Sequence, residues 1–452
     1  MFTSRRGSPA LARGATTLII LCFFLAACSP SGGLGGGSTT PTAVPTHTTL
    51  QAPSATPNGA SADTCPQELA QFAHCQTPHS MRVAYGIESL IEHGFTGKGQ
   101  TVVDIVSFGS PTLQQDIDAY DQQFGLPPIK IQVMSPLHEK ESDPYGDKAG
   151  WGDETTLDVE VIHALAPEAG IVVLTSPVAE TEGTFGLPEF RQLVQLTINH
   201  HLGSIISNSW GASEATLNNQ AGQQELQKWN TLLQQATTRQ GITFFAASGD
   251  QGASDFTDMR STKLASKPTT AFLADNPWVT SVGGTSLLGK GPNPQEVAWS
   301  SSGGGFSAFY PIPSYQQTLP ASVQSLFKNR RGVPDVAADS DPSTALANYV
   351  HGRWTMIGGT SASTPAWAAV GAIADQMAGH PLGFINPGLY KVGTSNIYTQ
   401  AFHDITVGDN SISDGSVNVK GYAAAAGWDA VTGFGSPNAA VLLPALIQAL
   451  KQ

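Results

Sequence analysis

Short apolar, β-branched runs alternate with helical patterns from about residue 80 onward. The apolar runs predict buried strands at Thr101–Val106, Ile171–Thr175, Ser204–Asn208, Ile242–Ala246 and Val279–Val282. Segments with apolar residues at helical spacing predict helices at Thr112–Phe124, Glu154–Leu165, Pro188–His201, Gln224–Arg239, Thr364–Met377 and Pro437–Gln452. Strands that alternate with helices of this length are typical of βαβ units, so we predict an α/β fold with a parallel sheet. Catalytic groups in such folds lie at the carboxyl ends of strands.

The N-terminal segment has a different pattern. Three arginines precede an apolar run over residues 17–27, which is too short to span a bilayer, so residues 1–28 predict an export signal. The run ends in Leu25-Ala26-Ala27-Cys28, which is similar to the lipobox of bacterial lipoproteins. We therefore expect a lipid anchor at Cys28. Cleavage after a small residue, which releases a freely secreted protein, is the alternative.

Residues 29–79 are expected to form a tether. Ser, Gly, Thr and Pro fill 24 of the positions 29–64, which leaves too little apolar surface to order the segment. Cys65 and Cys75 lie near the end of the tether. Export places them in an oxidising compartment, which favours a local disulfide, with two unpaired thiols as the alternative.

The composition narrows the class of protein. Only 13% of the residues are charged and the net charge is −13, which argues against a nucleic-acid-binding protein. The 40% of hydrophobic residues argues against disorder for most of the chain. We expect an extracellular or cell-surface monomer without nucleic-acid partners, and contact with the membrane only through Cys28.

Ser361 is a candidate nucleophile. It lies in the motif GTSASTP, a turn that leads into an apolar helix rich in small residues. Free backbone N–H groups and the helix dipole favour developing negative charge at a helix N-terminus. The alternative is an ordinary helix start, with a Ser or Thr N-cap and Pro in the first turn.

Glu154 and Asp158 are candidates for acid–base chemistry. Their i, i+4 spacing places both on one helix face, which continues through Val161 and Leu165 and borders a buried stripe. Partial burial should raise the pKa of at least one carboxyl and couple the two titrations, which makes a carboxylate a usable general base. Acidic residues also gather in first helical turns because the helix dipole favours them, but this explains Asp158 poorly.

Two further candidates follow predicted strands. Asp250, in SGDQG, could donate a hydrogen bond to an oxyanion if its carboxyl stays protonated, although the motif is also a common turn sequence. The backbone of Ser209, Trp210 and Gly211 could pair with an extended peptide. The alternative for this segment is a buried Trp210 that closes the core.

Two C-terminal loops carry oxygen ligands suited to a hard cation. Asp404 and Asp429 supply two carboxylates, and backbone carbonyls of both loops complete a set that suits Ca²⁺. The spacing does not match an EF-hand, and two ordinary polar loops are the alternative.

Taken together, these motifs resemble the sedolisin family, the serine-carboxyl peptidases. The resemblance extends from about residue 82 to the C-terminus and rests on GKGQTVVDIV, ALAPEA, ISNSWG, AASGDQG, SSGGGFS, VPDVAADSDP, GGTSASTPAWAA and HDI…GWDAVTGFGSPN. It implies a subtilisin-like parallel sheet flanked by helices, in a single catalytic domain over residues 80–452. It also implies an endopeptidase that acts on protein or peptide substrates.

The resemblance assigns a role to each candidate. Ser361 is the nucleophile, Glu154 is the general base, Asp158 orients Glu154, and Asp250 is the oxyanion-hole acid. One structural Ca²⁺ ion is expected, and its implied ligands are Asp404, Ile405, Ala425, Gly427 and Asp429. The three ligands between the two aspartates act through their carbonyl groups.

The chain departs from the family pattern in two places. Relatives usually carry a long, folded pro-segment, whereas the region before residue 80 is mostly the predicted tether. Many relatives also have an acidic residue after the first strand, which extends the proton relay. Val106 stands there in this chain, so the relay is expected to end at Asp158.

The carboxyl chemistry predicts activity in mild acid. Glu154 must be ionised while Asp250 is protonated, and reference carboxyl pKa values lie near 4, so both demands are met most easily there. Two other functions stay open: a non-catalytic, surface-displayed binding protein that retains the fold, and a subtilisin-type protease with a catalytic histidine. The missing HGTH-type helix disfavours the histidine-dependent protease.

Overall fold

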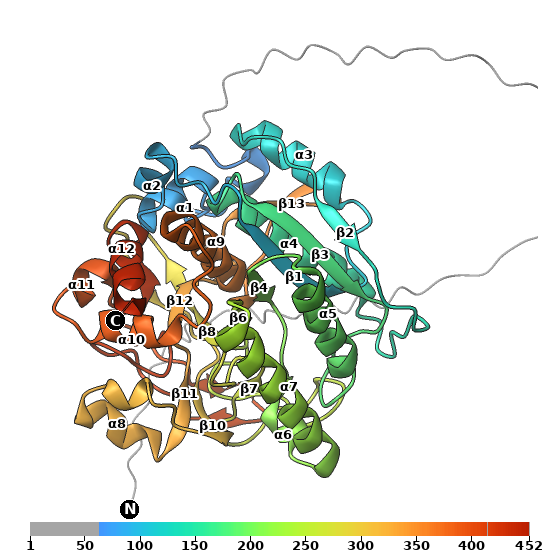
Figure 1. Cartoon of the computed structure of the whole chain (residues 1–452), viewed down its shortest axis with the longest axis vertical. Helices are drawn as coiled ribbons and strands as arrows, with labels where there is room; N and C mark the ends of the chain where they lie inside the picture. Colours follow the sequence, from blue (N-terminus) through green and yellow to red (C-terminus); the bar gives the residue numbers. More distant parts are fainter. Residues whose placement is uncertain (1–62, 414, 452) are drawn as a thin grey trace, which may run out of the picture. The chain divides into compact units, whose positions relative to one another are not determined.

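A mainly parallel sheet forms the centre of the folded unit in the computed structural model, which describes residues 63–413 and 415–451 (Figure 1). The strands lie in the order β12-β8-β6-β4-β1-β3-β2, all parallel, and β9 pairs antiparallel with β8. Their bounds are β1 (Thr101–Ser107), β2 (Gln132–Met134), β3 (Gly170–Ser176), β4 (Ile205–Asn208), β6 (Thr243–Ala247), β8 (Thr280–Leu287), β9 (Glu296–Ala298) and β12 (Val336–Asp339). Each predicted strand is present in this sheet.

Helices cover both faces of the sheet, and the alternation of β1 separates the two cores. Val102 and Val106 belong to the core beneath α4 and α9, whereas Val103 and Ile105 belong to the core beneath α5 and α7. The helices that match predictions are α3 (Leu113–Phe124), α4 (Lys148–Leu165), α5 (Leu187–His200), α7 (Gln220–Arg239), α9 (Thr360–Ala378) and α12 (Ala439–Leu450). The prediction of a parallel sheet flanked by helices is confirmed.

Three helices begin four or more residues earlier than predicted: α4 at Lys148, α7 at Gln220 and α9 at Thr360. The start of α4 at Lys148 was not predicted, because glycines and polar residues in its first turns hide the apolar periodicity. Helix α9 begins at Thr360, so Pro365 lies inside the helix and Ser361 lies in its first turn. Proline has no N–H to donate to the carbonyl four residues earlier, which here is the carbonyl of Ser361.

The remaining elements are short and lie mostly in the connections. They are η1 (Gln67–Leu69), α1 (Pro78–Ala84), α2 (Glu88–Glu92), β5 (Ala212–Ser213), α6 (Glu214–Leu217), β7 (Ala271–Phe272), β10 (Gly305–Pro311), η2 (Gln316–Thr318), α8 (Ala321–Phe327), β11 (Arg330–Val333), β13 (Ala347–Val350), β14 (Arg353–Met356), α10 (Asn386–Gly393), α11 (Tyr398–Ala401), β15 (Phe402–His403), β16 (Ile412–Ser413), β17 (Asn418–Val419) and β18 (Ser436–Pro437).

The folded unit begins earlier than the predicted boundary near residue 80. Cys65 and Cys75 form a disulfide, which was one of the two alternatives for these thiols. Gln76 is fully buried and donates to the carbonyl of Leu287, and Thr77 caps α1. The tether assignment is therefore wrong for the segment from Cys65 onward, because composition does not indicate a covalent constraint or two buried polar anchors. The export signal, Cys28 and the tether up to residue 62 lie outside the described residues.

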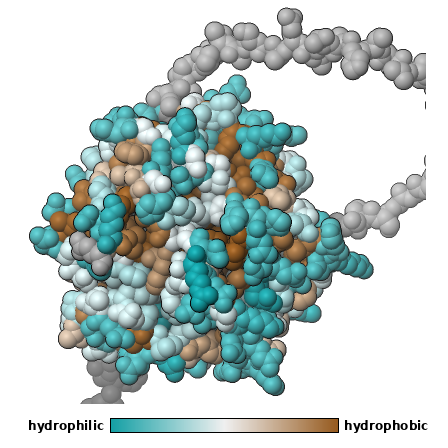
Figure 2. All heavy atoms as spheres, in the orientation of Figure 1, coloured by the Kyte–Doolittle hydropathy of each residue, from teal (hydrophilic) through white to brown (hydrophobic). Residues whose placement is uncertain are grey.

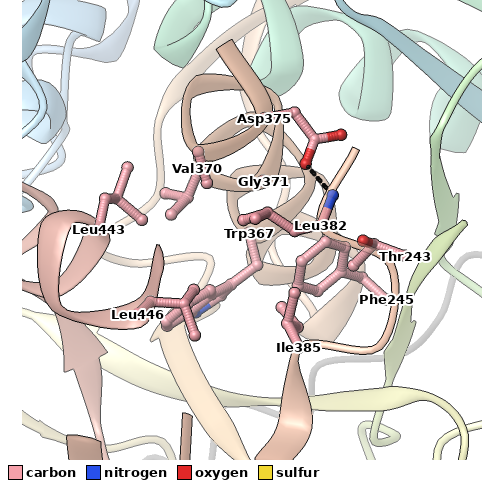
Figure 3. Close-up of a pocket in the computed structure, with 11 residues that line it drawn as sticks. Thr243, Phe245, Trp367, Val370, Gly371, Asp375, Leu382, Ile385, Leu443 and Leu446 are labelled. Carbon is pink, nitrogen blue, oxygen red and sulfur yellow. Dashed lines mark hydrogen bonds between the residues drawn. The ribbon is translucent and has the colours of Figure 1, made fainter. Parts of the chain in front are cut away.

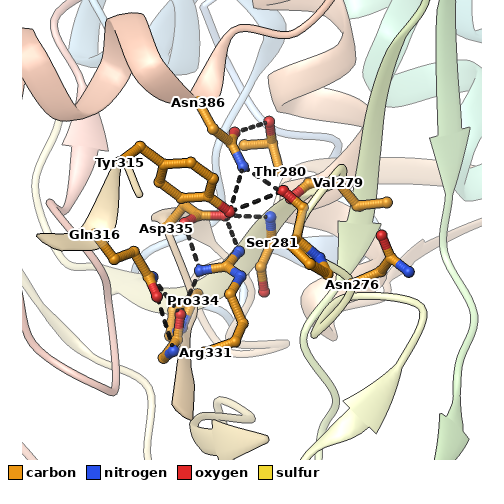
Figure 4. Close-up of polar contacts among 12 residues, drawn as sticks. Asn276, Val279, Thr280, Ser281, Tyr315, Gln316, Arg331, Pro334, Asp335 and Asn386 are labelled. Atoms are coloured by element: carbon orange, nitrogen blue, oxygen red, sulfur yellow. Dashed lines mark hydrogen bonds and ion pairs between the residues drawn. The ribbon is translucent and has the colours of Figure 1, made fainter. Parts of the chain in front are cut away.

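A buried ion pair fixes the C-terminal loops to the sheet (Figure 4). The guanidinium of Arg331 lies 2.5 Å from the carboxylate of Asp335, and both side chains are fully buried. Asp335 also accepts a hydrogen bond from the backbone N–H of Ser281 in β8, and its own carbonyl accepts one from the N–H of Phe434. Removal of either charged partner would leave the other buried and unpaired, so this network is structural.

Polar and apolar side chains are mixed on the face of the folded unit that Figure 2 shows. Within residues 63–413 and 415–451, none of the helices has the length and apolar character needed to cross a bilayer. The face in Figure 2 is mostly hydrophilic, and its hydrophobic side chains are exposed in small groups. Scattered exposure of this kind is ordinary for a folded protein surface.

Candidate active site

The structure brings Ser361 and Glu154 together. Ser361 lies in the first turn of α9, and Glu154 lies on α4, the helix that packs against α9. The Ser361 hydroxyl lies close enough to the Glu154 carboxyl to influence its titration. Burial raises the pKa of Glu154 to about 8; the interaction with Ser361 opposes this rise, and the nearby carboxyls add to it. A hydroxyl beside a base with a raised pKa is the arrangement that activates a serine nucleophile.

The carboxyl relay continues past Asp158, so the expectation that it ends there is wrong. Asp104 on β1 points to the same side of the sheet as Val102 and Val106, toward α4, and it is fully buried. The carboxyls of Asp158 and Asp104 lie close enough for their titrations to be coupled. Ionisation of both at once is costly when they are buried side by side, so we expect the pair to hold a proton.

Desolvation controls the protonation of this pair. Burial raises the pKa of Asp104 to about 7, and the interaction with Asp158 opposes the rise. Burial also raises the pKa of Asp158 well above its ordinary value, and the negative charges of Asp104 and Glu154 add to it. Both carboxyls of the pair therefore bind a proton more readily than exposed carboxyls do. The strand alternation is the sequence signal that could have identified Asp104.

The Ser209 hydroxyl contacts the candidate active site, and pairing of the Ser209 backbone with a substrate stays a prediction. Ser209 Oγ lies 2.8 Å from Asp158 Oδ1 and 3.2 Å from the carbonyl oxygen of Ser361. That carbonyl lacks its helical partner because Pro365 has no N–H. The hydroxyl of Ser209 thus connects the relay on α4 with the first turn of α9.

Asp250 lies next to the start of α9. Its Oδ1 accepts hydrogen bonds from the N–H of Thr360, at 2.7 Å, and from the Thr360 hydroxyl, at 2.8 Å. Burial raises the pKa of Asp250, and the two bonds from Thr360 oppose the rise. Because Oδ1 receives both donors, a proton on this carboxyl belongs on Oδ2.

Gly359 leaves room for that second oxygen. A Cβ at position 359 would lie 2.6 Å from Asp250 Oδ2, and the backbone φ of Gly359 is +113°. Both the space and the conformation exclude a side chain here. Oδ2 therefore lies against the backbone just before Ser361, where a protonated carboxyl can donate to an oxyanion.

Trp210 is a core residue. It is 5% exposed. Its ring packs edge-to-face with that of Phe190 and at a tilt against that of Trp229. A Cβ at Gly211 would lie 2.8 Å from the carbonyl oxygen of Phe272, so this glycine permits close packing with β7. The alternative reading of Trp210 as a residue that closes the core agrees with the structure, and substrate pairing by this backbone stays a prediction.

The predicted calcium ligands come together in two adjacent loops. Asp404 Oδ1 accepts hydrogen bonds from the Tyr398 hydroxyl, at 2.7 Å, and from the N–H of Gly427, at 3.1 Å. Asp429 Oδ2 accepts one from the N–H of Ala425 at 2.9 Å, and burial raises the pKa of Asp429 to about 6. Burial raises the pKa of the Tyr398 hydroxyl, and both carboxyls are close enough for their negative charges to raise it further, so Asp404 and Asp429 both lie near Tyr398.

The donor set of these loops is compatible with a hard cation. The Tyr398 hydroxyl also lies within 3.3 Å of the carbonyl oxygens of Gly427 and Phe434, so oxygen atoms dominate this region. Ile405 is buried beside Asp404. In the part of the chain that the structure describes, no cluster of three or more His, Cys, Asp or Glu side chains could hold a metal ion. A cation here would therefore depend on backbone carbonyls as well as the two carboxylates.

A small cavity behind α9 is unrelated to this chemistry. It has a volume of about 10 Å³ and is lined mainly by apolar side chains, including Phe245, Trp367 and Leu443 (Figure 3). Asp375 at its edge is satisfied by the N–H of Leu382 and the hydroxyl of Ser204. The cavity has no room for a peptide and is a packing defect of the core.

The fold and the site define a subtilisin-like α/β protein with a carboxyl relay behind its serine. Residues 149–382, which are 234 of the 452 residues, match the model of the subtilase family (Peptidase_S8), and the chain belongs to this family. Proteins with known names give a finer comparison. The chain is 33% identical to kumamolisin from Bacillus sp. (strain MN-32) over 370 residues, which are 79% of this chain and 62% of that protein.

Two other relatives support the resemblance to the sedolisin family. The chain is 34% identical to human tripeptidyl-peptidase 1 over 311 residues, which are 66% of this chain and 52% of that protein. It also matches a solved structure of Pseudomonas sedolisin, a serine-carboxyl proteinase complexed with two molecules of pseudo-iodotyrostatin, with a TM-score of 0.68 and 25% identity over 81% of this chain and 96% of that chain. The chain spans about half to three fifths of the length of the curated relatives.

Proposed function

We propose that the protein is an acid-active serine-carboxyl endopeptidase that hydrolyses protein or peptide substrates. The observation that carries the proposal is the proximity of the Ser361 hydroxyl to the Glu154 carboxyl, with the Asp158–Asp104 pair behind it. The groups that influence the titration of Glu154 are Ser361 and other carboxyls, and no histidine is among them. A protein with only a binding role would not need a buried, mutually repelling row of carboxyls, which is costly to maintain.

The proposed reaction uses the residues of this chain in sequence. Glu154 accepts the Ser361 proton as Oγ attacks the carbonyl carbon of the scissile peptide bond. Protonated Asp250 donates from Oδ2 to the oxygen that becomes negative. Glu154 then gives its proton to the leaving amine, and a water molecule releases the acyl group through the same two steps.

The pH range follows from the two kinds of carboxyl. Asp250 donates only while it is protonated, so activity is lost as pH rises through its raised pKa. Glu154 accepts only while it is ionised, so activity is lost at low pH, where the coupled row of carboxyls takes up its last protons. The buried relay titrates as a unit, which lets part of it stay ionised below neutrality. Mild acid is therefore the expected optimum.

Peptide hydrolysis from about pH 3 to pH 8 tests the proposal, with Ser361→Ala and Glu154→Gln beside the wild type. Both variants should lose at least about 100-fold in kcat, because nucleophilic and general-base catalysis each contribute at least that much. Ser363→Ala is the matched control, since Ser363 lies in the same helix turn and bonds only to the carbonyl of Thr360. Activity that survives Ser361→Ala, or peptide binding without any product, would contradict the proposal.

We also propose that one structural Ca²⁺ ion is bound by Asp404, Ile405, Ala425, Gly427 and Asp429. The oxygen-rich surroundings of Tyr398 support this assignment. The ion would neutralise two nearby carboxylates and brace loops that the Arg331–Asp335 network connects to the sheet. A chelator should lower the melting temperature of the wild type and leave that of Asp429→Asn unchanged. An equal melting temperature of the wild type with and without chelator would contradict the assignment.

Export to an oxidising compartment is a further part of the proposal, with a lipid anchor at Cys28 and a monomeric state. The Cys65–Cys75 disulfide supports the oxidising location. Detergent-phase partitioning of the wild type, abolished by Cys28→Ser, would support the anchor. Partitioning into the aqueous phase by both proteins would favour free secretion.

A further inference from the structure

Carboxyl side chains without basic partners gather on two loops, one of which also carries Asp250. Glu180 and Glu182 lie on the loop after β3, and Asp255 lies on the loop after β6. Glu180 is 7% exposed and Glu182 is 6% exposed. None of the ion pairs formed within residues 63–413 and 415–451 includes any of these three side chains. We call Glu180, Glu182 and Asp255 the acidic pocket.

The pocket lies against the segment predicted to pair with the substrate. Glu182 Oε2 accepts hydrogen bonds from the N–H of Ser213, at 2.8 Å, and from the Thr216 hydroxyl, at 3.0 Å. Ser213 follows two residues after Gly211. The two acidic loops also touch each other, because a Cβ at Gly183 would lie 2.7 Å from the sulfur of Met259.

Glu180 provides the observation that points to a ligand. Its Oε1 is buried and receives no hydrogen bond from the described part of the chain. The charged groups that face it are all acidic: Glu182, Asp147 and Asp255. Burial of a carboxylate oxygen without a hydrogen-bond donor costs free energy. The described part of the chain supplies no such donor, so we expect a ligand to supply it.

One carboxyl of the acidic pocket also interacts electrostatically with a carboxyl of the candidate active site. Asp255 is close enough to Asp250 for their charges to interact, and Glu214 and Glu182 also face it. Burial raises the pKa of Glu182 to about 7. Burial raises the pKa values of Glu180 and Asp255 well above their ordinary values, and repulsion among the carboxyls adds to both.

We infer that the acidic pocket binds the lysine or arginine side chain of the substrate residue that supplies the scissile carbonyl. This inference rests on the proposed peptidase function and names a substrate class for the same site. A metal ion is disfavoured, because the carboxyls of the described residues do not form a metal-binding group. A long basic side chain supplies several N–H donors and can lay its apolar stem along Met259, which is 40% exposed.

Binding of such a side chain is coupled to release of protons. The carboxyls must ionise to pair with the cation, so the cation lowers their pKa values. The groups involved are Glu180, Glu182 and Asp255, and the surrounding carboxyls that face them are those of Asp147, Asp258, Asp250 and Glu214. The preference for a basic side chain should therefore grow as pH rises from about 4 toward 7.

The test compares two peptides that differ only at the residue before the scissile bond, arginine in one and uncharged citrulline in the other. We expect the wild type to have at least about tenfold higher kcat/KM for the arginine peptide, since a charge-assisted hydrogen bond is worth ~1.5–3 kcal/mol. Glu180→Gln combined with Glu182→Gln should bring the ratio toward one. The amide introduced by Glu182→Gln would keep an acceptor oxygen for the N–H of Ser213, which guards the fold. Glu92→Gln, an exposed charge change on α2, is the matched control and should keep the wild-type ratio.

Two outcomes overturn the inference: equal kcat/KM values for both peptides in the wild type, or an unchanged ratio in the double variant. Hydrolysis of the citrulline peptide measures the proposed function separately, because that peptide does not need the acidic pocket. Calorimetric binding of the two peptides to Ser361→Ala gives a readout that does not depend on hydrolysis. Equal affinities for the two peptides there would also overturn the inference.

Discussion

The carboxyl of Asp158 on α4 lies next to the carboxyl of Asp104, which comes from the middle of β1, and the titrations of the two are coupled. The strand alternation that directs Val102 and Val106 toward α4 directs Asp104 there as well. A buried carboxyl behind Asp158 lets the relay hold a negative charge away from the serine. That charge also raises the pKa of Glu154. Asp104 is thus a positioning residue that acts on the base through its neighbours.

Replacement of Asp104 by asparagine should lower kcat and move the acid limb of the pH profile to lower pH. Without the negative charge of Asp104, the pKa of Glu154 falls and Glu154 becomes a weaker base. The loss of kcat should be about tenfold or more, because a hydrogen bond to a charged group is worth ~1.5–3 kcal/mol. The pH dependence of kcat and of kcat/KM measures both effects.

Asp375→Asn is the matched control for Asp104→Asn. Asp375 is a buried carboxyl at the far end of α9, where its oxygens accept hydrogen bonds that an amide oxygen can also accept. Its replacement should leave the acid limb in place. If the limb moves equally in both variants, a general loss of buried charge explains the effect and Asp104 has no special role.

Two replacements of Asp250 should distinguish its role as a hydrogen-bond donor to the oxyanion from the pH dependence that its titration causes. Asp250→Asn keeps an acceptor for Thr360 and places an amide donor that does not titrate at the position of Oδ2. The alkaline limb should therefore move to higher pH, toward whatever group titrates next. Asp250→Ala removes the donor and should cost about 10²–10³ in kcat. An alkaline limb that stays at the same pH in Asp250→Asn would exclude Asp250 as the titrating donor.

Two glycines at opposite ends of α9 allow a matched test of the geometry around Asp250. Gly359 and Gly379 both have positive φ, but a Cβ at Gly359 meets Asp250 Oδ2 at 2.6 Å, whereas a Cβ at Gly379 meets nothing within 4 Å. Gly359→Ala should abolish peptidase activity. Gly379→Ala should cost about 1 kcal/mol of stability from backbone strain and keep the activity. Equal activities of the two variants at a temperature where both are folded would contradict the assigned position of Oδ2.

Much of the fold could be predicted from the sequence, because hydrophobic periodicity reports directly on burial. The strand at Thr101–Val106 and the helix that carries Glu154 were predicted with only their ends displaced. The ends were missed for local reasons: polar first turns hide the start of α4, and Pro365 was taken as a first-turn signal although it lies inside α9. Helix ends depend on capping and tertiary contacts more than on periodicity.

The site was predictable where a residue type occurs in a motif and not where tertiary contacts decide its role. Ser361, Glu154 and Asp250 lie in recognisable motifs, and the structure brings them together. No role could be assigned to Asp104 from the sequence, because a strand carboxyl has no motif of its own and only its partner on α4 defines its role. The contact of the Ser209 hydroxyl with Asp158 could not be predicted either, because a separate helix positions Asp158.

The many buried carboxyls predict an unusual dependence of stability on pH. Burial raises the pKa of Glu154 to about 8, those of Asp104 and Glu182 to about 7, and that of Asp375 to about 6. In the unfolded chain these groups titrate near 4, so the folded state binds more protons than the unfolded state between about pH 4 and pH 8. The stability that these groups contribute is fully present below about pH 4 and is lost as pH rises toward 8.

The melting temperature should therefore be higher at pH 4 than at pH 7, at constant Ca²⁺ concentration. Scanning calorimetry at unit steps of pH measures this slope. Asp375→Asn removes one of the contributing groups without touching the catalytic site, so its melting temperature should change less between pH 4 and pH 7 than that of the wild type. A maximum of the melting temperature near neutrality would mean that the folded protein keeps these carboxyls ionised, which would contradict the raised pKa values of the buried carboxyls.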